Sequence, residues 1–102
     1  MYLIKIPKHI KVSGFDYKIR TSQRINAELK AQGLRGSHAE ALREIDIHTD
    51  APPQDLSNTF MHEIIHAINT VYAHCNLTEE HVDNVTNGIH QVLEQLKVRF
   101  VL

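Results

Sequence analysis

Residues 59–68 have the sequence TFMHEIIHAI and lie within a segment whose apolar residues are spaced as in a helix. Apolar side chains recur about one turn apart along this segment, at Met61, Ile64, Ile65, Ile68, Val71 and Tyr72. Such a stripe predicts an amphipathic helix whose apolar face packs against a core. Asp55 and Ser57 are both suitable N-caps, and we expect the helix to extend to about Ala73.

The preceding half of the chain has the pattern of short strands joined by turns. Residues 9–21 alternate apolar and polar side chains on both sides of Ser13-Gly14, which predicts a β-hairpin. Residues 23–30 fit a short helix, and Gly33 and Gly36 are expected to break it.

A third strand is predicted at residues 44–48, directly before the long helix. Ile45 and Ile47 would point to one face of this strand and the polar residues to the other. The consecutive prolines in residues 49–53 predict a loop between strand and helix, because proline is excluded from the interior of both.

A second long helix is predicted from Thr78 to about Lys97. Thr78 is a good N-cap, and Glu79 and Glu80 follow it at the end where the helix dipole favours negative charge. Its apolar stripe consists of Val82, Val85, Ile89, Val92, Leu93 and Leu96. The expected fold class is therefore α+β, with a small antiparallel or mixed sheet packed on two long helices.

Composition narrows the classes of function. The 102 residues suit a single domain, residues 1–102, and the formal net charge of −1 gives no basic field for a nucleic acid or an anionic membrane. The N-terminus has no apolar core typical of a signal peptide, and the single cysteine excludes an internal disulfide. We therefore expect a cytoplasmic protein. The eight histidines invite a search for metal ligands.

The pattern His62-Glu63-x-x-His66 inside the first long helix predicts a zinc site. Four helical residues turn ~400°, so both histidines lie on one face, where zinc accepts imidazoles at ~2.0–2.1 Å. Zinc lowers the pKa of its water toward ~7, and Glu63, ~100° round the helix, is placed to take the proton as general base. We expect the apolar neighbours to form a dry wall. The alternative is a helix with two partly exposed histidines and a solvated glutamate.

Two histidines need a third protein ligand. The residues after His66 lack the third histidine of metzincins, so we look for this ligand on the second long helix. Glu79 is favoured, because the start of that helix can return toward the first helix. Glu80 and His81 remain alternatives, since a carboxylate at a helix start can also serve only the helix dipole.

Residues 44–48 are the strand to which we expect an extended peptide substrate to add, through backbone hydrogen bonds at a sheet edge. The other histidines outside the motif include three whose spacing suggests no site, which are His9, His38 and His90.

The order of these features resembles the short zincin-like proteins of phages and prophages, which are related in form to ImmA/IrrE-like metallopeptidases. The resemblance extends from about Val12 to Leu96 and includes Leu77-Thr78-Glu79-Glu80 opening a helix that contains Gly88. It implies a minimal gluzincin in which a glutamate after the HExxH helix, best matched by Glu79, is the third ligand. ImmA-like relatives cleave regulatory proteins such as repressors, usually alongside a DNA-binding partner or domain, and no such domain is found in this chain.

The expected function is therefore a zinc-dependent metallopeptidase acting on a peptide or protein substrate, with no nucleic-acid or membrane partner. A chain this short has little material for a deep pocket, so an extended or unfolded segment is the expected substrate. One alternative is a non-catalytic metal-binding regulatory or interaction protein of phage origin. Another is a metal-free regulatory module in which the histidines are incidental.

Overall fold

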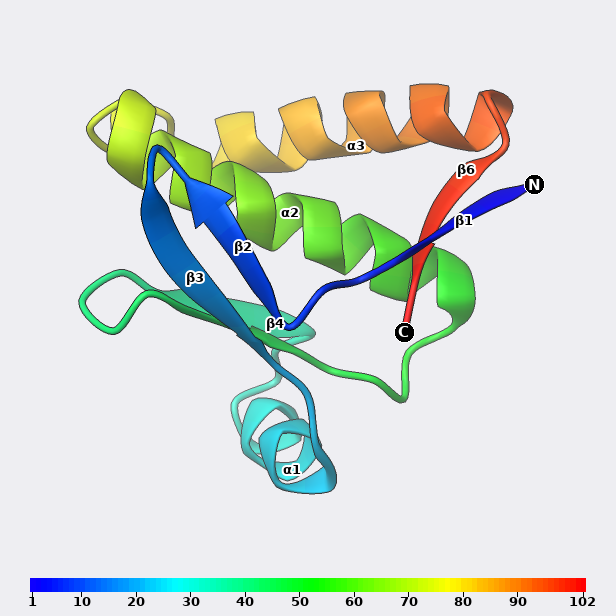
Figure 1. Cartoon of the computed structure of the whole chain (residues 1–102), viewed down its shortest axis with the longest axis horizontal. Coiled ribbons are helices and arrows are strands. Elements are labelled where there is room, and N and C mark those ends of the chain that lie inside the picture. Colours follow the sequence, from blue (N-terminus) through cyan, green and yellow to red (C-terminus); the bar gives the residue numbers. More distant parts are fainter.

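The computed structural model describes all residues, Met1–Leu102, and contains three helices and six strands. In chain order the elements are β1 (Tyr2–Lys5), β2 (His9–Val12), β3 (Phe15–Arg20), α1 (Gln23–Ala31), β4 (Gly36–Ala39), β5 (Glu44–Ile47), α2 (Pro53–Tyr72), α3 (Glu79–Gln95) and β6 (Val98–Val101). Helix α2 runs through the centre of the molecule, between the larger sheet and α3 (Figure 1). The predicted α+β class with a mixed sheet is confirmed.

The larger sheet has four strands in the order β2-β3-β5-β4. β2 and β3 form the predicted antiparallel hairpin, and Ser13 and Gly14 both have positive φ, at 52° and 81°, as a two-residue turn of type I′ requires. β3 pairs with β5 in parallel after the crossover through α1. Two hydrogen bonds between Asn26 and Thr49, of 2.8 and 2.9 Å, hold α1 at the end of the sheet.

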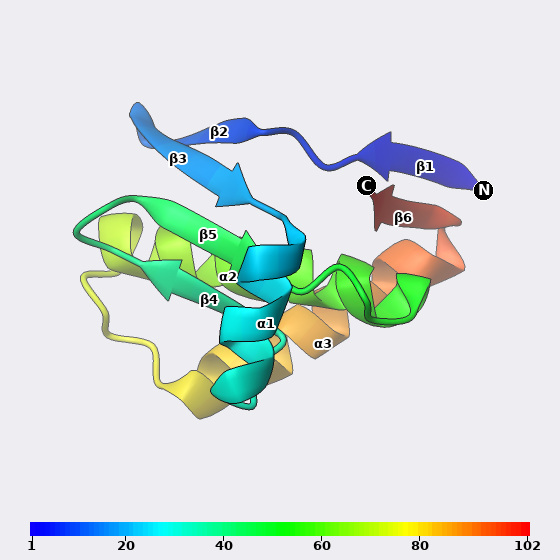
Figure 2. The same cartoon turned by 90° about the horizontal axis from the view of Figure 1, so that it is seen from below.

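Strand β4 corrects two expectations. Gly36 does not only break a helix, because residues 36–39 pair with β5 as an antiparallel edge strand. The segment Gly-Ser-His-Ala lacks the β-branched residues that mark strands, so its pairing depends on the partner that β5 provides. The strand predicted at residues 44–48 exists as β5, but it lies inside the sheet between β3 and β4 (Figure 2). A substrate therefore has no free edge at β5, and the expectation for that strand is wrong.

The two-stranded sheet of β1 and β6 is absent from the sequence prediction. Tyr2–Lys5 pairs in parallel with Val98–Val101, so the first and the last strand of the chain lie side by side. The amide of Phe100 donates to Ser57 Oγ at 3.0 Å, which ties β6 to α2. Pairing of strands so far apart in the chain leaves no local sequence signal.

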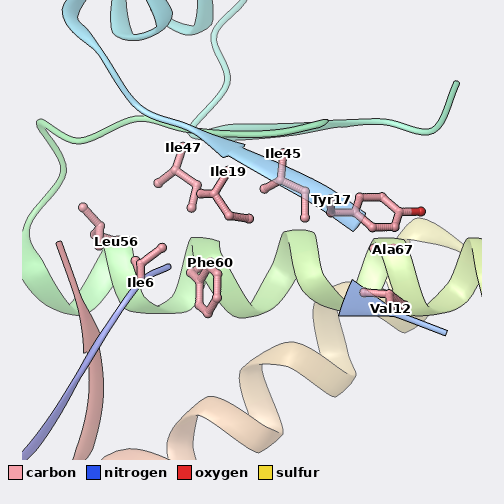
Figure 3. Close-up of a cluster of buried hydrophobic side chains, with 9 residues drawn as sticks. All are labelled: Ile6, Val12, Tyr17, Ile19, Ile45, Ile47, Leu56, Phe60 and Ala67. Carbon is pink, nitrogen blue, oxygen red and sulfur yellow. The ribbon is translucent and has the colours of Figure 1, made fainter. Parts of the chain in front are cut away.

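The core lies between the larger sheet and α2, and Figure 3 shows the side chains that fill it. Ile45 and Ile47 of β5 are fully buried, as their alternation predicts. From α2 the core receives Leu56, Phe60 and Ala67.

The predicted details of α2 need two corrections. Tyr72 belongs to the predicted apolar stripe but is 60% exposed, because the core-facing line of α2 runs through Phe60 and Ala67 instead. The helix begins at Pro53 without a side-chain cap, and neither Asp55 nor Ser57 is its N-cap. Proline fits the first turn, because an amide at that position has no partner within the helix.

Helix α3 starts as predicted, since the Thr78 hydroxyl accepts a hydrogen bond from the amide of His81 at 3.1 Å. Its predicted apolar stripe is buried only in part. Val82 is fully buried, whereas four members of the stripe remain exposed, namely Val85, Ile89, Val92 and Leu96. The reason is that α3 packs on α2 and β6 and not on the larger sheet. None of the three helices combines the length and apolar character that a membrane crossing requires.

Candidate metal centre

Three side chains from two helices converge at one point beside α2. The Nε2 atoms of His62 and His66 lie 3.0 Å apart. The Glu79 carboxylate reaches both, with Oε1 3.1 Å from His62 Nε2 and Oε2 3.0 Å from His66 Nε2. Ligand atoms of tetrahedral zinc, at bond lengths of ~2.0–2.1 Å, lie ~3.3–3.4 Å apart. Two imidazoles and a carboxylate at these separations fit zinc after shifts of a few tenths of an ångström.

A buried amide at the end of α2 places Glu79 opposite the histidines. Asn69 Oδ1 accepts from the amide of Leu77 at 3.1 Å, and its Nδ2 donates to the Leu77 carbonyl at 3.2 Å. These bonds fix the connection two residues before Glu79, where Thr78 then caps α3. Sequence reasoning missed Asn69, because an asparagine near a helix end also fits an ordinary helix terminus.

The two other predicted third ligands lie outside this convergence. The ring of His81 faces the start of its own helix, with Nδ1 3.4 Å from the Thr78 amide in a capping box. Glu80 is exposed and belongs to no group of metal-ligating side chains. The structure therefore brings Glu79, and neither Glu80 nor His81, to the two histidines.

Asp83 lies behind one of the two histidines of the centre, His62. Its Oδ1 lies 3.3 Å from His62 Nδ1, the ring nitrogen that does not face Glu79. A carboxylate on one nitrogen of a histidine fixes the tautomer that leaves the other nitrogen free for a metal. Asp83 lies one helical turn after Glu79, so the spacing Glu-x-x-x-Asp on one face of the helix is the signal that could have found it.

Glu63 lies beside the three donors and is buried. Its Oε1 is 4.0 Å from His62 Nε2, and its Oε2 has no hydrogen-bond partner in the protein. Burial raises the pKa of Glu63 to about 8, and the nearby charges of Glu79 and Asp46 add to this effect. The alternative of a solvated glutamate is wrong, because only 5% of Glu63 is exposed. A carboxyl group with a pKa near neutrality suits proton transfer.

Gly36 allows β4 to approach this carboxylate. A Cβ atom at Gly36 would lie 2.7 Å from Thr59 Cγ2 and 3.2 Å from Glu63 Cγ, both on α2. Any larger residue would therefore push β4 away from the helix. Sequence reasoning treated this glycine only as a breaker.

The donors open into a cleft bounded by the residues from Gly33 to β4, by α2 and by the first turns of α3. Only one of the 13 residues that line it is hydrophobic, namely Leu34. The expected dry, apolar wall is therefore wrong. Among the apolar neighbours of the motif, Phe60 and Ala67 belong to the core and Ile64 packs against it. Arg35 is the one lysine or arginine at the cleft.

His38 also lines the cleft, which corrects the expectation that its position suggests no site. Its ring lies against that of His66, with centroids 6.0 Å apart and planes 7° from parallel. Burial lowers the pKa of His38, and the positive charge of a protonated His66 lowers it further. No pattern in the sequence relates residue 38 to residue 66, because the contact depends on how β4 packs against α2.

Comparison of the chain with protein-family models, with curated protein sequences and with solved structures finds no match.

Proposed function

We propose that this protein is a zinc-dependent peptidase in which His62, His66 and Glu79 hold the ion and Glu63 is the general base. The observation that carries the proposal is the convergence of four donor atoms from His62, His66 and Glu79, at contacts of 3.0–3.1 Å, beside a buried carboxylate with an unpartnered oxygen. Two histidines and one glutamate are the protein ligands of a class of catalytic zinc sites that keep the fourth position for water or substrate.

Bound zinc would supply Lewis-acid chemistry, which polarises a peptide carbonyl and makes water acidic. Glu63 would accept the proton of the attacking water through Oε2, the oxygen without a partner in the protein. Glu63 would then pass that proton to the departing amine. Asp83 would hold His62 in the tautomer that directs Nε2 toward the ion.

The outer edge of β4 is the surface that suits an extended peptide. β4 pairs with β5 on one side only, and three of its residues line the cleft, Gly36, Ser37 and His38. A peptide added to this edge would gain backbone hydrogen bonds that place few demands on its side chains. The polar lining provides no deep apolar pocket, which also favours recognition through the backbone.

The test combines metal analysis with turnover of an unfolded protein such as denatured casein. We expect one zinc per chain in the wild type, and loss of zinc in His62→Ala and Glu79→Ala. Glu63→Gln should retain zinc and lose at least about 100-fold in rate. Glu80→Gln is the matched control, because it removes an adjacent carboxylate outside the centre. Activity that persists in Glu63→Gln would remove Glu63 from the mechanism.

The second candidate is a non-catalytic metal-binding protein with a regulatory or interaction role. The polar lining of the cleft favours it, because with one hydrophobic residue among 13 the cleft offers no apolar pocket for a substrate side chain. Zinc binding without turnover of any unfolded substrate, and unfolding on chelation, would support this function. The resemblance to phage zincin-like proteins is compatible with either candidate and supports the proposed zinc centre.

A further inference from the structure

The two histidines of the centre are held in different ways. Asp83 lies 3.3 Å from Nδ1 of His62, but the only carboxylate within 4.0 Å of a ring nitrogen of His66 is that of Glu79, which lies at Nε2. A metal-bound histidine usually has its second nitrogen held by a carboxylate or a carbonyl. His66 therefore needs another means to keep its ring plane aimed at the ion.

A row of rings provides that means. The ring of His62 meets the ring of His66 edge to face, at 4.7 Å and 70°. His66 also stacks on His38, nearly parallel at 6.0 Å and 7°, and His38 in turn stacks on Tyr17 at 6.2 Å and 24°. Tyr17 lies in the core strand β3 and is only 1% exposed, so the row ends on a fixed residue.

We propose that His38 is a positioning residue that sets the ring plane of His66 by stacking, as Asp83 orients His62 through Nδ1. This inference rests on the proposed zinc centre. The torsion that turns an imidazole about its bond to Cβ has a broad energy profile, so an unsupported ring loses orientation easily. A lone pair binds zinc only when the ring plane contains the ion, and a parallel neighbour on one face limits rotation out of that plane.

The expected size of the effect follows from the energy of aromatic stacking. Offset parallel rings at these separations contribute beyond their buried area, by an amount equal to about two- to tenfold in an equilibrium constant. Removal of the His38 ring should therefore weaken zinc binding by more than about twofold and up to about tenfold. A phenyl ring at the same position should restore affinity, because the ring face and not a ring nitrogen contacts His66.

The experiment compares the full chain with His38→Ala, His38→Leu and His38→Phe, and with His9→Ala as a control for loss of an exposed histidine. Zinc affinity is measured by competition with a chromophoric chelator, and the geometry of the centre by the absorption bands of bound cobalt. Denaturant unfolding of the metal-free variants shows whether each one folds. Leucine fills the site without a ring, so it replaces alanine in the comparison if the alanine variant does not fold.

We expect weaker zinc binding and altered cobalt bands in the alanine and leucine variants, and values close to wild type for His38→Phe and His9→Ala. Affinity within about twofold of wild type in the leucine variant, with unchanged bands, would overturn the role of His38 and leave the zinc centre intact. A phenylalanine variant as weak as leucine would overturn stacking as the cause. A wild-type chain that binds no zinc would instead overturn the centre itself, and this inference with it.

Discussion

Replacement of Glu63 with glutamine should change how the stability of the metal-free protein depends on pH. Glu63 has a folded-state pKa of about 8, above the value of 4.5 for an unperturbed glutamate. The folded chain therefore binds this proton more tightly than the unfolded chain. The stability linked to it is complete below pH 4.5 and is lost as the pH rises through 8. Glutamine does not titrate, so the variant lacks this loss.

The size of the effect follows from the two pKa values. Each pH unit within the window between them costs the wild type about 1.4 kcal/mol of unfolding free energy. From about pH 5.5 to about pH 7.5 the wild type should therefore lose about 2.5 kcal/mol relative to Glu63→Gln. Groups that do not contact Glu63 contribute equally in both proteins and cancel in the difference.

The assay is urea unfolding of both proteins after removal of metal with a chelator, at several pH values across this window. A difference in unfolding free energy that stays constant within about 0.5 kcal/mol would refute the raised pKa of Glu63. Saturating zinc should reduce the pH dependence of this difference in unfolding free energy, because a cation beside the carboxylate favours its charged form.

Three further substitutions test how the centre is built. Glu79→Gln should weaken zinc binding by at least about tenfold, whereas Glu80→Gln should leave it unchanged, as measured by chelator competition. Asp83→Asn should reduce zinc affinity by about 10-fold or more while the metal-free unfolding free energy stays close to wild type, and equal affinity would contradict its contact with His62. Gly36→Ala should cost about 1–3 kcal/mol in urea unfolding, since its Cβ has no room against α2, and an unchanged midpoint would contradict the close approach of β4.

The position of Asn69 shows why a metal centre needs more than its ligands. Its side chain bonds both backbone groups of Leu77, and the chain then enters α3 with Glu79 in the first turn. The HExxH pair lies on one helix and is preorganised by helical geometry alone. The third donor must be brought from another helix, and the connection between the helices sets its distance.

The sequence by itself determined the features that depend on residues close together in the chain. The hairpin at Ser13-Gly14, the cap at Thr78 and the common face of His62 and His66 all follow from local geometry and hydrogen bonding. The alternation of Ile45 and Ile47 likewise predicted their burial. The same reasoning favoured Glu79 only as the best of three neighbours. The packing of α3 on α2 decides which of residues 79, 80 and 81 faces the histidines.

The tertiary structure alone decided which of these residues meet. Edge strand β4 has no strand-like composition, and it exists because β5 offers a partner. The burial of Glu63 depends on Gly36 of that strand, and the row of rings depends on His38 of the same strand. A contact between elements is set by the packing of whole helices and strands, which no short window of sequence contains. For that reason the sequence predicted the motif. It did not predict the environment that raises the pKa of Glu63 and orients His66.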